Sequence, residues 1–171
     1  MRVIGYHGTS DAAARRILSS GFEISRNDYD WLGDGAYFFQ DAPMRALEWA
    51  RQRYGDHAAV IGAEIDLRNC VDLIDAKWHE VVRESYTDLV SRLQASAQPL
   101  PRQTHGAHRL DREVINRMTA VLESRGVLVR VVRAAFAEGD PLFPGSALWS
   151  QSHIQVAVRD PAAIVRIWRV E

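Results

Sequence analysis

The order of helix-type and strand-type segments is the feature that most limits the folds open to this chain. Strand-type patterns cover 2–7, 35–39, 58–67 and 127–132, and two more strands, from 153 onward, are joined across Asp160 and Pro161. A first helix-type pattern runs through 12–18 and ends at Gly21, and others cover 43–54, 77–96 and 111–122. Since the two types do not alternate in a regular βαβα repeat, we predict an α+β fold with a mostly antiparallel sheet and flanking helices.

Length and composition are those of one globular domain. The chain has 171 residues, 47% of them hydrophobic and 25% charged, so we expect a single domain over residues 1–171. No apolar run is long enough to cross a membrane, and no signal-peptide pattern opens the chain. Cys70 is the only cysteine, which excludes an internal disulfide and a cysteine-only metal site. A cytosolic location is therefore expected. The net charge of −1 predicts no polyanionic partner.

Three polar segments interrupt these elements. Residues 23–34 and 138–151 read as ordered loops, and residues 97–109, with two prolines and a glycine, form the best linker candidate. His105 and His108 lie in that linker, without a carboxylate or cysteine at a ligand-like spacing. No metal site is expected there.

Three other stretches could form one site. In "YHGTS", His7 ends a strand, Gly8 lets another backbone or a ligand come close, and Ser10 or Asp11 caps the next helix. In "LGDGAYFF", residues 32–39, two glycines leave Tyr37 beside open backbone. In "SHIQVAV", residues 152–158, strand alternation puts His153, Gln155 and Ala157 on one face.

Taken in order, these stretches resemble the ADP-ribosyltransferase superfamily, in the branch of diphtheria toxin and the poly(ADP-ribose) polymerases. The matching segments are "HGTS", "ARRILSSGF" at 14–22, "GDGAYFF" at 33–39, "ALEWA" at 46–50 and "IQVAVRDPAAIVRIW" at 154–168. The resemblance spans nearly the whole chain and is strongest in the first third. It implies a split, mostly antiparallel sheet with an NAD+-binding cleft between its halves.

The resemblance also implies roles for residues of the first strand. His7 would hydrogen-bond the adenosine-side ribose of NAD+, and the backbone of Gly8 would pair with the nicotinamide amide. Thr9 or Ser10 would assist nearby. Taken without the family pattern, His7 reads as a hydrogen-bonded structural histidine.

Further roles fall on aromatic and basic residues. By resemblance, Tyr37 stacks on the nicotinamide ring, and Trp49 lies within one residue of a second stacking position. Arg26 is a candidate for the adenosine or pyrophosphate end. Core packing is the alternative for Trp49, and a solvated side chain is the alternative for Arg26.

The last position of the family's His-Tyr-Glu triad departs from the pattern, because Gln155 stands where the glutamate belongs. A carboxamide can hydrogen-bond a ribose hydroxyl, but it cannot take a proton or balance a cationic transition state. The resemblance then implies transfer of a single ADP-ribose unit. The alternatives for a base are His153, Asp28 and Asp30, or an acceptor that needs none.

The predicted function is thus transfer of one ADP-ribose unit from NAD+ to a macromolecular acceptor, protein or nucleic acid, chosen by residues 25–34 and part of 138–151. Small standalone domains of this family in bacteria often act as toxins in toxin–antitoxin or antiphage systems, so a cognate antitoxin is an expected partner. The alternatives are an NAD+ hydrolase, or a catalytically silent module that binds an ADP-ribose-like ligand or nucleic acid.

Overall fold

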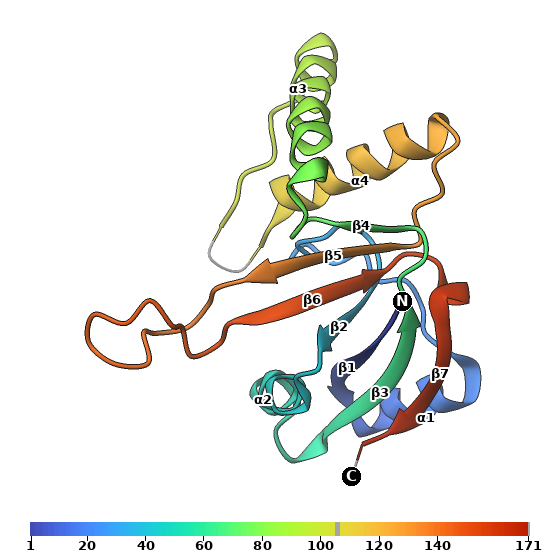
Figure 1. Cartoon of the computed structure of the whole chain (residues 1–171), viewed down its shortest axis with the longest axis vertical. Coiled ribbons are helices and arrows are strands. Elements are labelled where there is room, and N and C mark those ends of the chain that lie inside the picture. Colours follow the sequence, from blue (N-terminus) through green and yellow to red (C-terminus); the bar gives the residue numbers. More distant parts are fainter. Residues whose placement is uncertain (105–106, 171) are drawn as a thin grey trace.

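A computed structural model describes residues 1–104 and 107–170; His105, Gly106 and Glu171 lie outside the described residues. The described residues form the expected α+β fold (Figure 1). The strands are β1 (Arg2–Ser10), β2 (Ala36–Gln40), β3 (Ala58–Asp66), β4 (Cys70–Asp72), β5 (Val131–Phe136), β6 (His153–Val158) and β7 (Ile164–Arg169). The helices are α1 (Asp11–Ser20), α2 (Pro43–Tyr54), α3 (His79–Ala95) and α4 (Arg109–Ser124).

The strands form one open sheet in the order β4-β5-β6-β2-β1-β3-β7. Every strand pair is antiparallel except β4 with β5. The shortest strand pairing, here named the open joint, lies in the middle of the sheet. Strands β1 and β2 pair only at Gly5 with Gln40 and at Tyr6 with Phe39. The long pairing of β1 with β3, by contrast, runs from Arg2 to Ser10. Strands β1 and β2 therefore diverge after Tyr6.

Helices cover the two halves of the sheet separately. Helix α4 packs Ile115, Met118 and Leu122 against β4, β5 and β6, and α3 lies beside it (Figure 1). Ala14 of α1 packs against one face of β1 and β3, and Ala46 of α2 lies in a smaller cluster beside β2 and β3. The cluster around Ala14 also takes Val131 of β5 and Val156 and Val158 of β6, so it continues under both halves of the sheet.

Most element boundaries follow the sequence signals. Ser10 caps α1 by accepting a hydrogen bond from the N–H of Ala13 (3.2 Å), and Gly21 ends the helix at a φ of +82°. Gly55 ends α2, as predicted. Helix α4 begins at Arg109, two residues before the predicted cap at Asp111.

One strand was missed by the sequence prediction, and another was placed wrongly. The three residues of β4 were not predicted, because so short a run carries no periodic signal. The strand predicted over 127–132 is wrong in position, since β5 covers Val131–Phe136. Val127 and Leu128 are 42% and 49% exposed, because the chain is still crossing from α4 toward the sheet there. The apolar character of "VLVRVV" does not distinguish the exposed Val127 and Leu128 from the buried Val131 and Val132.

The linker candidate at 97–109 connects two helices that lie together. Arg117 of α4 forms an ion pair with Asp88 of α3. The backbone N–H of His108 donates to the carbonyl of Asp28 (2.8 Å). In the described part of this segment, the chain is thus a helix-to-helix connection rather than a flexible spacer.

Residues 137–152, here named the projecting loop, extend away from the sheet between β5 and β6 (Figure 1). Backbone hydrogen bonds such as that from Leu142 N to Leu148 O (2.9 Å) keep it in a hairpin-like shape. None of the helices described in the structure is long and apolar enough to cross a membrane.

Candidate functional site

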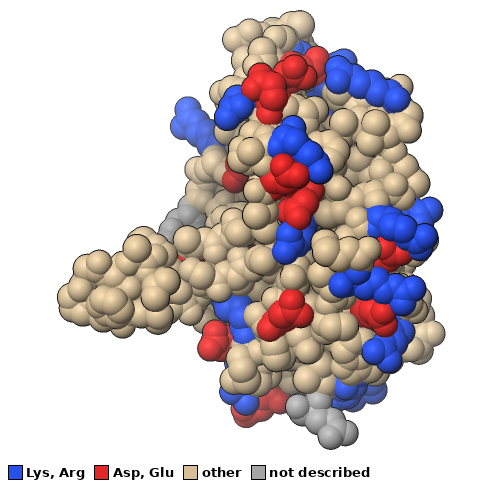
Figure 2. Space-filling view, in the orientation of Figure 1, with Lys and Arg blue, Asp and Glu red and all other residues tan. Residues whose placement is uncertain are grey.

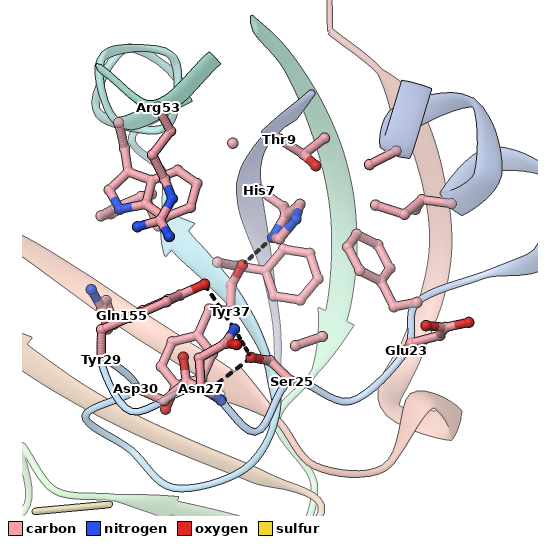
Figure 3. A pocket seen from close by; sticks show the side chains of 18 of the residues that line it. His7, Thr9, Glu23, Ser25, Asn27, Tyr29, Asp30, Tyr37, Arg53 and Gln155 are labelled. Atoms are coloured by element: carbon pink, nitrogen blue, oxygen red, sulfur yellow. Dashed lines mark hydrogen bonds between the residues drawn. The ribbon is translucent and has the colours of Figure 1, made fainter. Parts of the chain in front are cut away.

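A pocket of about 460 Å³ lies where β1 and β2 diverge (Figure 3). Its wall takes residues from β1, α1, β2, α2 and β6, from residues 23–35 and from the start of the projecting loop. The volume is within the range of small-molecule sites. The open joint of the sheet therefore becomes a cavity bordered by both halves.

His7 bridges the gap between the diverging strands (Figure 3). Its Nδ1 lies 2.8 Å from the carbonyl oxygen of Tyr37, which can only accept, so Nδ1 carries the hydrogen. Burial lowers the pKa of His7, against the opposing effect of this hydrogen bond. The neutral ring then has a lone pair on Nε2, and this nitrogen can accept a hydrogen bond from a hydroxyl in the pocket.

Gly8 offers its backbone to the same pocket. The carbonyl of Ile4 accepts a hydrogen bond from the N–H of Asp41 (2.9 Å), on the β2 side of β1. The two-residue period of a strand directs the N–H and C=O of Gly8 to that side as well, beyond the last β1–β2 pair. A Cβ at Gly8 would lie 2.2 Å from the carbonyl oxygen of Ala46, so only glycine fits under α2.

Tyr37 forms the floor of the pocket and holds residues 23–35, here named the anchored loop. Its hydroxyl accepts from the N–H of Leu32 (2.8 Å) and donates to the carbonyl of Gly33 (2.6 Å). Burial raises the pKa of Tyr37 strongly, so the phenol stays protonated. The ring lines the pocket, and the hydroxyl is used entirely by the loop.

Asp30 is the buried polar centre of the anchored loop. Its Oδ2 accepts from the hydroxyl of Ser25 and from the N–H of Asn27, both at 2.8 Å. Burial raises the pKa of Asp30, and these two hydrogen bonds oppose the rise. The carboxylate therefore fixes the loop where it borders the pocket.

Helix α2 contributes one face to the pocket through Arg45, Trp49 and Arg53, spaced four residues apart. The guanidinium carbon of Arg53 lies 4.5 Å from the ring centroid of Tyr29 and 5.1 Å from that of Trp49. Among the described residues Arg53 forms no ion pair. This face thus combines aromatic surface with a cation that can bind an anionic ligand.

Gln155 reaches the pocket from β6, beside Phe39 of β2. Its Oε1 is buried and has no hydrogen-bond partner in the described structure. An unpartnered buried acceptor costs about 1–3 kcal/mol.

The structure brings most of the predicted site residues together. The pocket is lined by His7, Gly8, Thr9, Tyr37, Trp49 and Gln155. Ser10 lies outside its lining and caps α1. Arg26 also lies outside, with a side chain 77% exposed and 3.8 Å from Asp34. The arginines of the pocket are instead Arg16, Arg45 and Arg53.

Of the three candidates for a catalytic base, one lines the pocket and two lie outside its lining. Asp30 lines the pocket. Asp28 forms an ion pair with Arg109 (2.6 Å), away from the pocket lining. His153 is buried behind the wall, where its Nδ1 donates to the carbonyl of Gln151 (2.7 Å) and its ring packs on Phe39.

Sequence reasoning missed Arg45, Arg53, Tyr29 and Glu138. The four-residue spacing from Trp49 places the two arginines on its helix face and could have identified them. Nothing comparable marks Glu138, which enters the pocket from the start of the projecting loop.

No family model matches the chain. A stretch of 72 residues is 35% identical to an uncharacterized protein of Methanocaldococcus jannaschii. The match covers 38% of this chain and 33% of that protein, so the chain spans about a third of that relative's length. That similarity concerns sequence alone and brings no activity with it.

Proposed function

We propose that the chain is an NAD+-dependent mono-ADP-ribosyltransferase acting on a macromolecular acceptor. The observation that carries the proposal is the meeting of His7, Gly8 and Tyr37 with Gln155 in one pocket, at the open joint of the sheet. These residues come from three separate strands; His7, Gly8 and Tyr37 offer the groups that the resemblance assigns to them, and Gln155 stands at the position of the family's glutamate.

The pocket's polar groups suit the two riboses and the amide of NAD+. His7 Nε2 and the carboxamide of Gln155, which both line the pocket, can each hydrogen-bond a ribose hydroxyl. The N–H and C=O of Gly8 can pair with a carboxamide, which has both a donor and an acceptor. The Tyr37 ring provides stacking worth about 0.5–1.5 kcal/mol beyond burial.

Anionic groups have partners as well. Arg16 lies at the α1 end of the pocket and Arg53 at the α2 end, and in the described residues neither forms an ion pair. Either guanidinium can hold a pyrophosphate, in place of the predicted Arg26. An NAD+-sized ligand thus finds hydroxyl, amide, aromatic and phosphate partners along one wall.

The identity of Gln155 favours a single transfer over chain elongation, since elongation requires a base that activates a ribose hydroxyl. The acceptor in this proposal is a protein or a nucleic acid. In a bacterial toxin setting, a cognate antitoxin would cover the pocket or the loops beside it.

The test incubates purified protein with labelled NAD+ and a cell extract. We expect nicotinamide release and transfer of label to a macromolecule, and digestion with protease or nuclease then names the acceptor class. His7→Ala and Tyr37→Ala should lose both activities. His57→Ala and Tyr86→Ala, at exposed positions outside the pocket, should keep them.

Other outcomes are equally informative. Nicotinamide release without label transfer, in several extracts, would indicate an NAD+ hydrolase. Binding of NAD+ without release would indicate a binding module. Absence of both binding and release would refute the proposed function.

A further inference from the structure

A charge problem remains in the pocket if the proposed function holds. Breaking the bond between nicotinamide and ribose develops positive charge on the ribosyl group, as in glycoside cleavage. A nearby carboxylate stabilises such a state, and Gln155 is neutral. A carboxylate from another part of the chain would have to supply the negative charge.

Three carboxylates line the pocket among the described residues: Glu23, Asp30 and Glu138. Glu23 is exposed and lies next to Phe22 at the α1 end, away from Gln155 (Figure 3). Asp30 is committed to Ser25 and Asn27. Glu138 has no such engagement, since no hydrogen bond to its carboxylate is formed by the described residues.

The register of β5 and β6 places Glu138 on the same sheet face as Gln155. Ala134 pairs with Gln155 and Phe136 with His153, and the carbonyl of Glu138 accepts from the N–H of Gln151 (3.0 Å). Every second residue shares a face, so Glu138 continues the row that begins opposite Gln155. Its side chain is 29% exposed and lines the pocket.

A largely buried arginine lies beside Glu138 without forming a hydrogen bond to its carboxylate. Its Oε2 lies 3.7 Å from Nη2 of Arg45, a distance that is within the range of an ion pair but longer than a hydrogen bond. Arg45 is only 13% exposed at its side chain, so its charge is weakly screened.

His153 does not neutralise this carboxylate, although its Nδ1 lies 3.6 Å from Oε2 of Glu138. The hydrogen on Nδ1 is donated to the carbonyl of Gln151, and burial lowers the pKa of the ring. The imidazole is therefore neutral, and Arg45 is the cation beside Glu138.

We infer that Glu138 is the catalytic carboxylate of this pocket and takes the role that Gln155 cannot fill; the inference rests on the proposed function. As the C1′–nitrogen bond breaks, its electron pair leaves with nicotinamide, and Glu138 offsets the positive charge on the ribosyl group. The acceptor's nucleophile then forms its bond to C1′, and the proton that it loses passes to water. Gln155 holds a ribose hydroxyl in place during both changes.

The experiment measures nicotinamide release and the dissociation constant of NAD+ for the full chain and for Glu138→Gln. We expect kcat to fall by about 100-fold, the effect of removing one transition-state contact, with the dissociation constant changed less than about threefold. Glu48→Gln is the control, because it makes the same charge change at an exposed position on α2 outside the pocket.

A second variant guards against a merely local disturbance. Adding Gln155→Glu to Glu138→Gln should restore part of kcat, because it returns a carboxylate to the same face of the sheet. If Glu138→Gln keeps kcat within about threefold of the unchanged protein, the role of Glu138 is refuted and the proposed function survives. If the unchanged protein binds NAD+ but releases no nicotinamide, both are refuted.

Discussion

The anchored loop and the projecting loop border the same pocket but differ in the side chains that they bury and expose. The anchored loop turns polar groups inward, with Asp30 only 4% exposed and bonded to Ser25 and Asn27. The projecting loop turns apolar groups outward, with Phe143 60% and Leu148 63% exposed. Both loops contain backbone hydrogen bonds, but only the anchored loop is built around a buried carboxylate.

Under the proposed function, this difference assigns the binding of NAD+ to one loop and contact with the acceptor to the other. A loop crosslinked by buried polar groups has a fixed shape, which suits a wall that orients a small ligand. A loop with exposed apolar side chains next to a pocket marks contact with another macromolecule. Figure 2 shows no Lys, Arg, Asp or Glu on the viewed face of the projecting loop, and this surface suits a protein acceptor better than a nucleic acid.

The largest expected effect comes from removing the hydroxyl that fixes the anchored loop. Tyr37→Phe leaves the N–H of Leu32 and the carbonyl of Gly33 without their partner in a buried place. The free energy of unfolding should fall by about 1–3 kcal/mol, measured by urea denaturation. Tyr29→Phe is the control, since the Tyr29 hydroxyl accepts only from the exposed Asn27 side chain. Equal effects of the two variants would contradict the anchoring role.

The next effect concerns the projecting loop. Phe143→Ser combined with Leu148→Ser should change the free energy of unfolding by less than about 0.5 kcal/mol, because both side chains are exposed. Nicotinamide release should stay unchanged, while label transfer to a protein acceptor should fall about tenfold. Val165→Ser, 45% exposed on β7, serves as the control. Unchanged transfer would assign acceptor contact to the anchored loop instead.

A smaller effect is expected on the helix face that meets the anchored loop. Arg53→Ala removes a cation from the pocket and its contact with Tyr29. NAD+ should bind about fivefold more weakly, measured by calorimetric titration, because a charge-assisted contact to phosphate is lost. Arg51→Ala lies on the same helix outside the pocket and should bind normally. A normal affinity for Arg53→Ala would leave the phosphate to Arg16.

The smallest effect is on pH dependence. Burial lowers the pKa of both His7 and His153, so the unfolded chain binds more protons just below pH 6.5. The free energy of unfolding should therefore fall as the pH is lowered from 7 to 5.5. This fall should be smaller than the loss of unfolding free energy caused by Tyr37→Phe. His153→Gln should flatten this dependence, and His57→Gln should not. A flat profile in the unchanged protein would show that protonating these rings costs little.

Local signals in the sequence predicted the fold well where a single residue decides the outcome. Ser10 caps α1 and Gly21 ends it because capping and positive φ are properties of those residues. Strand β4 and the true start of β5 escaped prediction, since both depend on which distant segment lies alongside.

The site was predictable only in part for the same reason. The aromatic and glycine positions stood in recognisable runs, so His7, Gly8 and Tyr37 could be placed together. Arg26 sits in a promising polar loop but points to solvent and to Asp34. Glu138 lies 17 positions before Gln155, and only the pairing of β5 with β6 brings both to one sheet face.

The two-residue joint between β1 and β2 has a mechanical consequence. A sheet bends most easily along the line with the fewest cross-strand bonds, and in this molecule that line passes beside the pocket. The hydrogen bond from the imidazole of His7 to the carbonyl of Tyr37 still joins the two strands beyond this line. We expect a ligand that contacts both sides of the pocket to oppose such bending, so the stiffness of the sheet should rise with occupancy.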